Sequence, residues 1–167
     1  MKKYKVLIVE DESIIRKNLA DIVHDVPYYE AIESGNGMDA LNKIYMHQRW
    51  FGFKSNDIKC ILLDIKMPGM NGLTFLKYLR LMETMNLFMP MIPVVFISAY
   101  DELENWNAVL HNRVVEYIKK PISPAKLVDT LDRIIIHYET EAMSFFTKEK
   151  AIKMKNMHEL KLSDYGF

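Results

Sequence analysis

Short apolar runs that end abruptly at polar residues constrain this chain more than any other feature. The runs are rich in β-branched residues, a pattern that predicts strands buried on both faces of a sheet. Four of them are clear, at Val6–Val9, Ile61–Leu63, Val94–Ile97 and Val114–Ile118, and Tyr28–Ile32 is a weaker fifth. Such strands require helices on both faces of their sheet.

Amphipathic helical patterns lie between these runs, with apolar residues three and four positions apart. Ser13 is expected to cap the first helix, with Ile14 on its apolar face and Arg16 on its solvent face. Ser123 followed by Pro124 predicts the start of the last helix. The patterns between them predict helices at 36–45, where Met38 and Tyr45 are expected on the apolar face, at 71–85 and at 101–110.

Strands that alternate with helices predict a parallel sheet with right-handed crossovers. Five βα units are too few for an eight-stranded barrel. We therefore expect an α/β fold of the (βα)5 type: a doubly wound, flavodoxin-like sandwich of three layers. Its five-stranded parallel sheet is expected to carry the site beyond the carboxyl ends of the strands. The domain is expected to span 1–137, and 138–167 to form a helical extension or linker.

Composition excludes several classes of protein. Lys+Arg and Asp+Glu balance at 22 each, whereas a general nucleic-acid or membrane-surface binder is usually basic. Cys60 is the single cysteine, so an internal disulfide and a multi-cysteine zinc site are excluded. The run Val6–Val9 is too short for a secretory signal, and no stretch approaches the roughly 20 apolar residues of a membrane span. We therefore expect a cytoplasmic protein that binds neither membrane nor nucleic acid directly.

Polar residues with complementary chemistry follow the predicted strands. Glu10 and Asp11 follow the first, Asp64 ends the third, Ser98 ends the fourth and Lys120 follows the fifth. Three carboxylates in one pocket repel each other unless a cation is present, and hard oxygen ligands suit Mg²⁺. Such a cluster can hold a phosphoryl group, which one carboxylate attacks. The alternative for the acidic pair alone is a solvent-exposed helix cap.

These strand ends match a known family. The chain resembles, over about residues 4–135, the receiver domain of two-component response regulators, also described as CheY-like. Four motifs in the family's order carry the resemblance: Val-Leu-Ile-Val-Glu-Asp-Glu at 6–12, Leu-Asp-Ile-Lys-Met-Pro-Gly-Met-Asn-Gly at 63–72, Ile-Ser-Ala at 97–99, and Tyr-Ile-Lys-Lys-Pro at 117–121.

The resemblance implies roles for the acidic residues. Asp64 is expected to accept the phosphoryl group. Asp11 is expected to bind Mg²⁺ (or Mn²⁺) directly, Glu10 to hold it through water, and the backbone carbonyl of Lys66 to be a further ligand. The family often has aspartate where this chain has Glu10.

Further roles follow from the resemblance at the last two strands. Ser98 is expected to hydrogen-bond the phosphoryl group and Lys120 to pair with it, through a cis bond to Pro121. Lys119, one residue earlier, is expected to point to the other side of the strand. Tyr117 is expected to be the aromatic switch, although a packing residue is the alternative at that position.

The residues two positions after Asp64 and Ser98 flank the path of attacking water in receivers. Here they are Lys66 and Tyr100, both bulky and neither suited to orienting water. We therefore expect slow self-dephosphorylation. Met67, Pro68 and Gly72 are interpreted as residues that shape the loop after Asp64.

The resemblance implies a signalling domain rather than a classical enzyme. Its donor is expected to be a sensor histidine kinase or a histidine phosphotransfer protein. Its output is expected from the fourth helix, fifth strand and fifth helix, and a homodimer through this face or the C-terminal extension is possible. One rival is a haloacid-dehalogenase-like phosphatase, which needs an aspartate where Lys66 stands. The other is a receiver-like interaction or dimerisation module that works without phosphorylation.

Three regions depart from the family pattern: 46–57, the connection over 85–91, and the fourth-helix region ending at Arg113. The tail lies outside the family core. The segment 46–57 lengthens the second helix or its loop, either as a packed helical turn or as a partner-binding patch. The tail over 138–167 follows an apolar spacing near a heptad and then becomes mildly basic. A stand-alone receiver and a part of a longer regulator both remain open.

Overall fold

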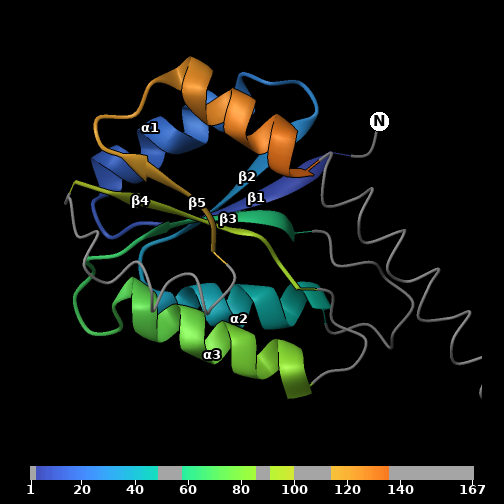
Figure 1. Cartoon of the computed structure of the whole chain (residues 1–167), viewed down its shortest axis with the longest axis vertical. Coiled ribbons are helices and arrows are strands. Elements are labelled where there is room, and N and C mark those ends of the chain that lie inside the picture. The colour runs from blue at the N-terminus through green and yellow to red at the C-terminus, as the bar shows by residue number, and fades with distance from the viewer. Residues whose placement is uncertain (1–2, 49–57, 86–90, 100–113, 136–167) are drawn as a thin grey trace, which may run out of the picture. The chain divides into compact units, whose positions relative to one another are not determined.

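The computed structural model describes residues 3–48, 58–85, 91–99 and 114–135 (Figure 1). The chain divides into two compact units, Met1–Ile134 and Ile135–Phe167, and the elements below are those of the first. Several features predicted from the sequence lie outside the described residues: Tyr100, the helix predicted at 101–110, residues 49–57 of the lengthened segment, and the tail from 138.

Five parallel strands form one sheet in the order β2-β1-β3-β4-β5. The strands are β1 (Tyr4–Val9), β2 (Tyr29–Ser34), β3 (Ile58–Asp64), β4 (Val94–Ser98) and β5 (Val114–Lys119). Each strand predicted from an apolar run is present. The doubly wound α/β fold is therefore confirmed, with the strand order of flavodoxin-like proteins.

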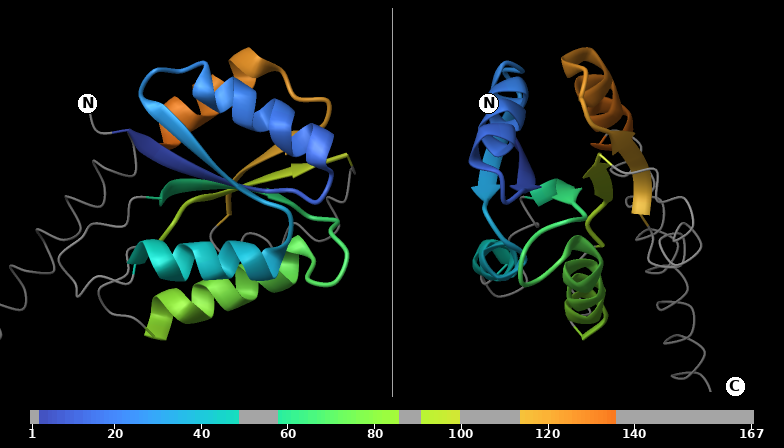
Figure 2. Two further views of the ribbon diagram at one scale, coloured as in Figure 1. Left: turned by 180° about the vertical axis from the view of Figure 1, so that it is seen from behind. Right: turned by 90° about the vertical axis from the view of Figure 1, so that its left-hand side faces the viewer.

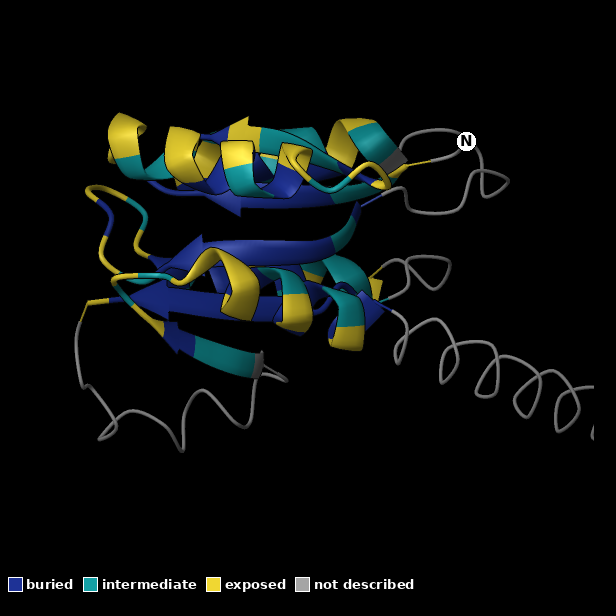
Figure 3. Ribbon diagram, turned by 90° about the horizontal axis from the view of Figure 1, so that it is seen from above, coloured by how far each residue is buried: buried dark blue, intermediate teal, exposed yellow. Residues whose placement is uncertain are grey.

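Helices cover both faces of this sheet. They are α1 (Ser13–His24), α2 (Gly37–Gln48), α3 (Gly72–Met85) and a helical segment at 124–135. Figures 1 and 2 show α1 and the 124–135 segment on one face, with α2 and α3 side by side on the other. Figure 3 shows the consequence for burial: the central strands are mostly dark blue, the edge strand β2 is largely teal, and the outward-facing parts of the helices are yellow.

The apolar runs fill the centre of these layers. Residues Val6, Leu7, Ile8 and Val9 are all fully buried, because a strand covered on both faces has no solvent side. Each such side chain contributes roughly 1.5–3 kcal/mol relative to leaving it in water. Cys60 is buried among them, as expected of a small apolar residue, and burial raises the pKa of its thiol to about 12.

Several helix-face predictions are wrong. Helix α1 begins at Ser13, so Glu12 is its N-cap residue and makes no side-chain capping bond. Ile14 is 75% exposed. It precedes the buried Val23 by nine residues, about 2.5 turns, and so lies on the opposite side of the helix.

The same displacement occurs in α2. Met38 and Tyr45 are exposed, because the sheet contacts this helix through the buried side chains of Ala40 and Ile44. The sequence of this helix contains more apolar residues than the strip of side chains that contacts the sheet. The sequence alone does not show which of these residues face the sheet.

Candidate functional site

The side chains predicted at the strand ends do converge. Glu10 directly follows β1, Asp64 and Ser98 are the last residues of β3 and β4, and Lys120 directly follows β5. These strands are neighbours in the sheet, so their ends meet at one edge. Glu10, Asp64 and Ser98 are buried there, with 1%, 5% and 2% of their surface exposed.

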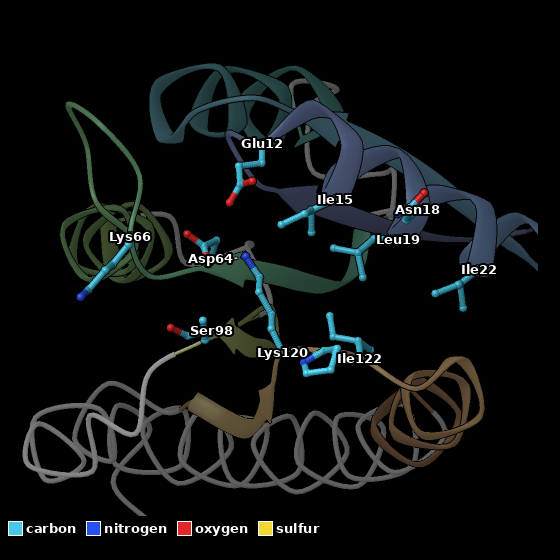
Figure 4. Close-up of a pocket in the computed structure, with 12 residues that line it drawn as sticks. Glu12, Ile15, Asn18, Leu19, Ile22, Asp64, Lys66, Ser98, Lys120 and Ile122 are labelled. Carbon is cyan, nitrogen blue, oxygen red and sulfur yellow. Dashed lines mark hydrogen bonds and ion pairs between the residues drawn. The ribbon is translucent and has the colours of Figure 1, made fainter.

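Three carboxylates and one ammonium form the centre of this site. Oxygen atoms of Glu10, Asp11 and Asp64 all lie within 4.8 Å of one another. The Nζ atom of Lys120 lies 2.7 Å from Oε2 of Glu10 and 2.9 Å from Oδ1 of Asp64 (Figure 4). Lys120 supplies one positive charge against three negative charges, so the cluster carries excess negative charge.

The loop after β1 orients the Glu10 carboxylate. The backbone N–H of Glu10 donates to the carbonyl of Ser34 at 3.0 Å, which continues the pairing of β1 with β2. The N–H of Glu12 donates to Oε1 of Glu10 at 3.3 Å. Glu10 is therefore held by Lys120 at one carboxylate oxygen and by the backbone at the other.

Arg16 joins this loop, and its predicted place on the solvent face is wrong. Its Nη1 atom donates to the backbone carbonyls of Glu10 and Asp11 at 2.7 and 3.2 Å. The helical pattern placed Arg16 outside because a helical wheel follows the Cα position and not the reach of a long side chain. One sequence feature could have indicated this role: Arg16 follows the acidic pair Glu10 and Asp11 by five to six residues, within reach of a long side chain.

The loop after β3 brings the next helix close to Asp64. The N–H of Gly72 donates to the carbonyl of Ile65 at 2.9 Å. A Cβ atom on Gly72 would lie 2.3 Å from the backbone oxygen of Asp64, so only glycine permits this approach. Gly69 has a φ of 74°, and Met67 is buried. The loop-shaping interpretation of this segment is consistent with these contacts.

Burial and charge shift the pKa values in this cluster. Burial raises the pKa of the Glu10 carboxyl, and the charge of Asp64 adds to that effect against the hydrogen bond from Lys120. Burial likewise raises the pKa of Asp64, against the Lys120 hydrogen bond. Burial alone would lower the pKa of Lys120, but its hydrogen bonds to both carboxylates raise it. Both carboxylates are thus incompletely compensated.

The donor set fits a hard divalent cation. Carboxylate oxygens are the ligands that Mg²⁺ prefers, and two of the three carboxylates here are buried, where their mutual repulsion is least screened by water. A cation at Glu10, Asp11 and Asp64 would remove the excess negative charge.

The remaining predicted residues lie near this centre. The hydroxyl of Tyr117 donates to the carbonyl of Ser98 at 3.2 Å, and its ring packs against the core. The Lys120–Pro121 bond is cis, as expected, and Lys119 is exposed. Figure 4 shows the side chain of Lys66 pointing away from Asp64. The backbone N–H of Lys66 hydrogen-bonds the Asp64 carboxylate.

A cavity of about 630 Å³ opens beside Asp64. Asp64, Ser98 and Lys120 form its polar end. Its apolar wall consists of Ile15, Leu19 and Ile22 from α1 together with Pro121 and Ile122 (Figure 4). The carboxylate is therefore reached from a partly apolar groove between α1 and the segment after β5.

Comparisons with known proteins agree with this geometry. The model of the response regulator receiver domain family matches residues 6–132. The chain is 29% identical over 134 residues to the transcriptional regulatory protein HptR of Staphylococcus aureus, covering 79% of this chain and 46% of that protein. It therefore spans about half the length of the curated relatives that it matches.

Solved structures show the same fold. The chemotaxis protein CheY4 of Vibrio cholerae superposes with a TM-score of 0.65 at 25% identity, covering 79% of this chain and 98% of that one. A CheY-like receiver domain protein from Methanospirillum hungatei gives a TM-score of 0.68 at 24% identity, covering 84% and 99%. The latter likeness supports the fold alone.

No helix within the described ranges is both long and apolar enough to cross a membrane. The acidic cluster of Glu10, Asp11 and Asp64 is typical of a receiver Mg²⁺ site and consistent with a phospho-acceptor site. Receivers are signalling domains rather than classical enzymes, and membership of the family implies a histidine kinase partner. On the family match, the fold and the acidic pocket, this chain belongs to the receiver domain family of two-component response regulators.

Proposed function

We propose that this chain is a phosphorylation switch in which Asp64 accepts a phosphoryl group from a phosphohistidine of a sensor kinase or phosphotransfer protein. One observation carries the proposal: the Asp64 carboxylate lies at the carboxyl edge of the sheet between two further carboxylates and the ammonium of Lys120. A nucleophile, a cation site and a counter-charge are thereby brought together.

The chemistry is a transfer between two nucleophiles. An oxygen of Asp64 attacks the phosphorus, the P–O bond of an acyl phosphate forms, and the P–N bond to the donor histidine breaks with its electron pair returning to the imidazole. Asp11, Asp64 and the backbone carbonyl of Lys66 would hold Mg²⁺ or Mn²⁺ directly, and Glu10 would hold it through water. The bound ion would neutralise charge at the phosphoryl oxygens.

Lys120 and Ser98 hold the remaining phosphoryl oxygens. The ammonium of Lys120 is already 2.9 Å from Oδ1 of Asp64, so it needs little movement to reach a group bonded there. Ser98 is buried at the adjacent strand end and brings a hydroxyl to the same cavity. Both interactions strengthen as negative charge develops on the transferred group.

The signal leaves the site through Ser98 and Tyr117. The Tyr117 hydroxyl is bonded to the Ser98 carbonyl, so a shift of Ser98 towards the phosphoryl group changes the position that the ring prefers. Phosphorylation thereby redistributes two existing conformations. The output surface is expected to comprise β5, the helical segment at 124–135 and the helix predicted at 101–110, which lies outside the described residues. This face or the C-terminal extension is where two copies would pair. The switch operates in the cytoplasm.

The acyl phosphate is expected to be long-lived. Lys66 and Tyr100 occupy the positions that flank the path of attacking water, and neither side chain is suited to orienting it. Replacing Lys66 with asparagine provides an amide that can hold water and is expected to speed decay. An unchanged decay rate in Lys66→Asn contradicts this part of the proposal.

The test is the intact mass of the protein after incubation with acetyl phosphate and Mg²⁺. We expect a gain of one phosphate, lost in Asp64→Asn and lost in EDTA. Asp39→Asn is the matched control, because Asp39 is an ion-paired carboxylate outside the cluster, and it should still gain phosphate. No gain in the unchanged protein contradicts the proposal and favours the module that works without phosphorylation.

A further inference from the structure

We propose that Arg16 is a positioning residue for the divalent-cation site: its guanidinium fixes the backbone of Glu10 and Asp11 so that both carboxylates face Asp64. The inference rests on the proposed function, because it concerns the cation that phosphorylation requires. Arg16 itself does not contact the reacting atoms and acts through the two acidic residues.

The contacts are made by a single nitrogen. Nη1 of Arg16 lies 2.7 Å from the carbonyl oxygen of Glu10 and 3.2 Å from that of Asp11. One donor group therefore bridges two successive peptide units, those that carry two of the three clustered carboxylates. Rotation of either peptide unit would break one of these bonds and would turn the attached side chain.

These two carbonyls need a donor other than the backbone N–H groups of the helix. Helical bonding begins with the N–H of Arg16 donating to the carbonyl of Glu12 at 2.9 Å. The carbonyls of Glu10 and Asp11 precede that bond and receive no N–H from the helical ladder. The Arg16 side chain bonds to these two carbonyls from inside the same turn.

The guanidinium is held from a second side by β2 and the loop after it. Its Nε lies 3.5 Å from Oε2 of Glu33, and a Cβ atom at Gly35 would come within 3.4 Å of Nη1. The Arg16 side chain is 20% exposed. A planar guanidinium can bond in two directions at once from this enclosed position, whereas a lysine ammonium offers one charged point.

A purely structural role is the competing explanation, and the chain contains a matched control for it. Nη1 of Arg80 also donates to a backbone carbonyl, that of Ile92 at 3.0 Å, and also pairs with a glutamate, Glu83. Arg80 and Glu83 lie on α3, and Ile92 lies just before β4, at the opposite end of that strand from Ser98. Removing it disturbs an equivalent set of bonds without touching the acidic cluster.

The experiment is a calorimetric titration of the full chain with Mg²⁺ alone, with the unfolding free energy measured in parallel. We expect Arg16→Met to raise the dissociation constant for Mg²⁺ about 10-fold or more, the usual effect of removing a group that orients metal ligands. Arg16→Lys should recover part of the affinity. Arg80→Met should keep the unchanged affinity even though it is less stable.

A second readout separates affinity from chemistry. The phosphorylation rate of Arg16→Met with acetyl phosphate should reach that of the unchanged protein at saturating Mg²⁺, because Asp64, Ser98 and Lys120 are untouched. A rate that stays low at saturation would overturn the assignment, since the defect would then lie in the reacting groups.

The other outcomes are equally decisive. A dissociation constant for Arg16→Met within about twofold of the original overturns the inference, as does an equal loss in Arg80→Met. If Arg16→Met does not fold, Arg16→Lys decides, and an unchanged affinity there overturns the inference. If Arg16→Met binds Mg²⁺ more weakly but the original protein never gains phosphate, the role of Arg16 is supported and the proposed function is contradicted. If the original protein gains phosphate but Arg16→Met binds Mg²⁺ as tightly as the original, the proposed function is supported and the role of Arg16 is contradicted.

Discussion

Two ionic groups in the described part of the chain are similarly buried but are built differently. At the carboxyl edge of the sheet, the side chains of Lys120 and Glu10 are 15% and 2% exposed. Where α3 leads towards β4, those of Arg80 and Glu83 are 14% and 7% exposed. Burial therefore does not distinguish the two groups, but the number of charges in each does.

Among the described residues, the pair on α3 matches one positive charge with one negative charge. Glu83 also accepts from the N–H of Ile92 at 2.8 Å, and Arg80 donates to the carbonyl of the same residue. The edge cluster instead sets three carboxylates against one ammonium. A balanced pair fastens the start of a strand, whereas an unbalanced cluster remains ready to bind a cation.

The largest effect is expected from breaking the balanced pair. Glu83→Ala should lower the unfolding free energy by about 3–5 kcal/mol, because Arg80 stays buried without this partner and the N–H of Ile92 loses its acceptor. Urea denaturation measures the loss. The double variant Arg80→Met with Glu83→Leu is the control and should cost much less. A loss below about 1 kcal/mol for Glu83→Ala would show that the pair does not stabilise the fold.

The next largest effect on the unfolding free energy is expected when Mg²⁺ neutralises the excess negative charge of the edge cluster. Mg²⁺ at 100 times its dissociation constant should raise the unfolding free energy by about 2.7 kcal/mol, because the ion binds the folded chain. Glu83→Ala should gain as much as the original protein, and Asp64→Asn less. The comparison is made at constant ionic strength with NaCl. An equal gain from NaCl would mean that the acidic cluster holds no cation site.

The same contrast explains which residues could be predicted from the sequence and which could not. Glu10, Asp64 and Ser98 were predictable because a polar residue that ends a buried apolar run stands out from its surroundings. Arg16 and the Arg80–Glu83 pair were not predictable in this way. Their partners include backbone carbonyls in loops outside their own helices. These are reached by long side chains that a helical pattern assigns to solvent.

The third prediction reverses the sign of the first. Asp64→Asn in EDTA at neutral pH should not destabilise the chain, and we expect a gain on the order of 1 kcal/mol, because one of three mutually repelling carboxylates is removed. Glu83→Gln, the matched change in the balanced pair, should instead lose stability. Denaturant unfolding of both variants tests this. A loss in Asp64→Asn as large as that in Glu83→Gln would remove the distinction between the two groups.

The smallest effect concerns a pair that is balanced but exposed. Asp39 bonds Nζ of Lys43 at 2.5 Å and accepts from the hydroxyl of Ser34 at 2.6 Å. Its side chain is 41% exposed, so water screens the charge. Asp39→Asn should therefore cost less than about 1 kcal/mol at neutral pH. The Asp39–Lys43 pair has the same ratio of charges as the Arg80–Glu83 pair but is more exposed, so comparing the two pairs isolates the effect of burial.

The pH dependence of that small loss gives the final test. Burial would raise the pKa of Asp39, but the hydrogen bonds from Lys43 and Ser34 outweigh it and hold the pKa below the ordinary value of 3.8. The folded chain thus releases this proton more readily than the unfolded chain. The stabilisation by Asp39 is therefore complete above pH 3.8 and is lost as the pH falls through the lower folded value.

The difference in unfolding free energy between the original protein and Asp39→Asn should shrink over that window. A difference that grows on acidification would mean that the folded chain holds the Asp39 proton more tightly than the unfolded chain, the reverse of what its two hydrogen bonds require.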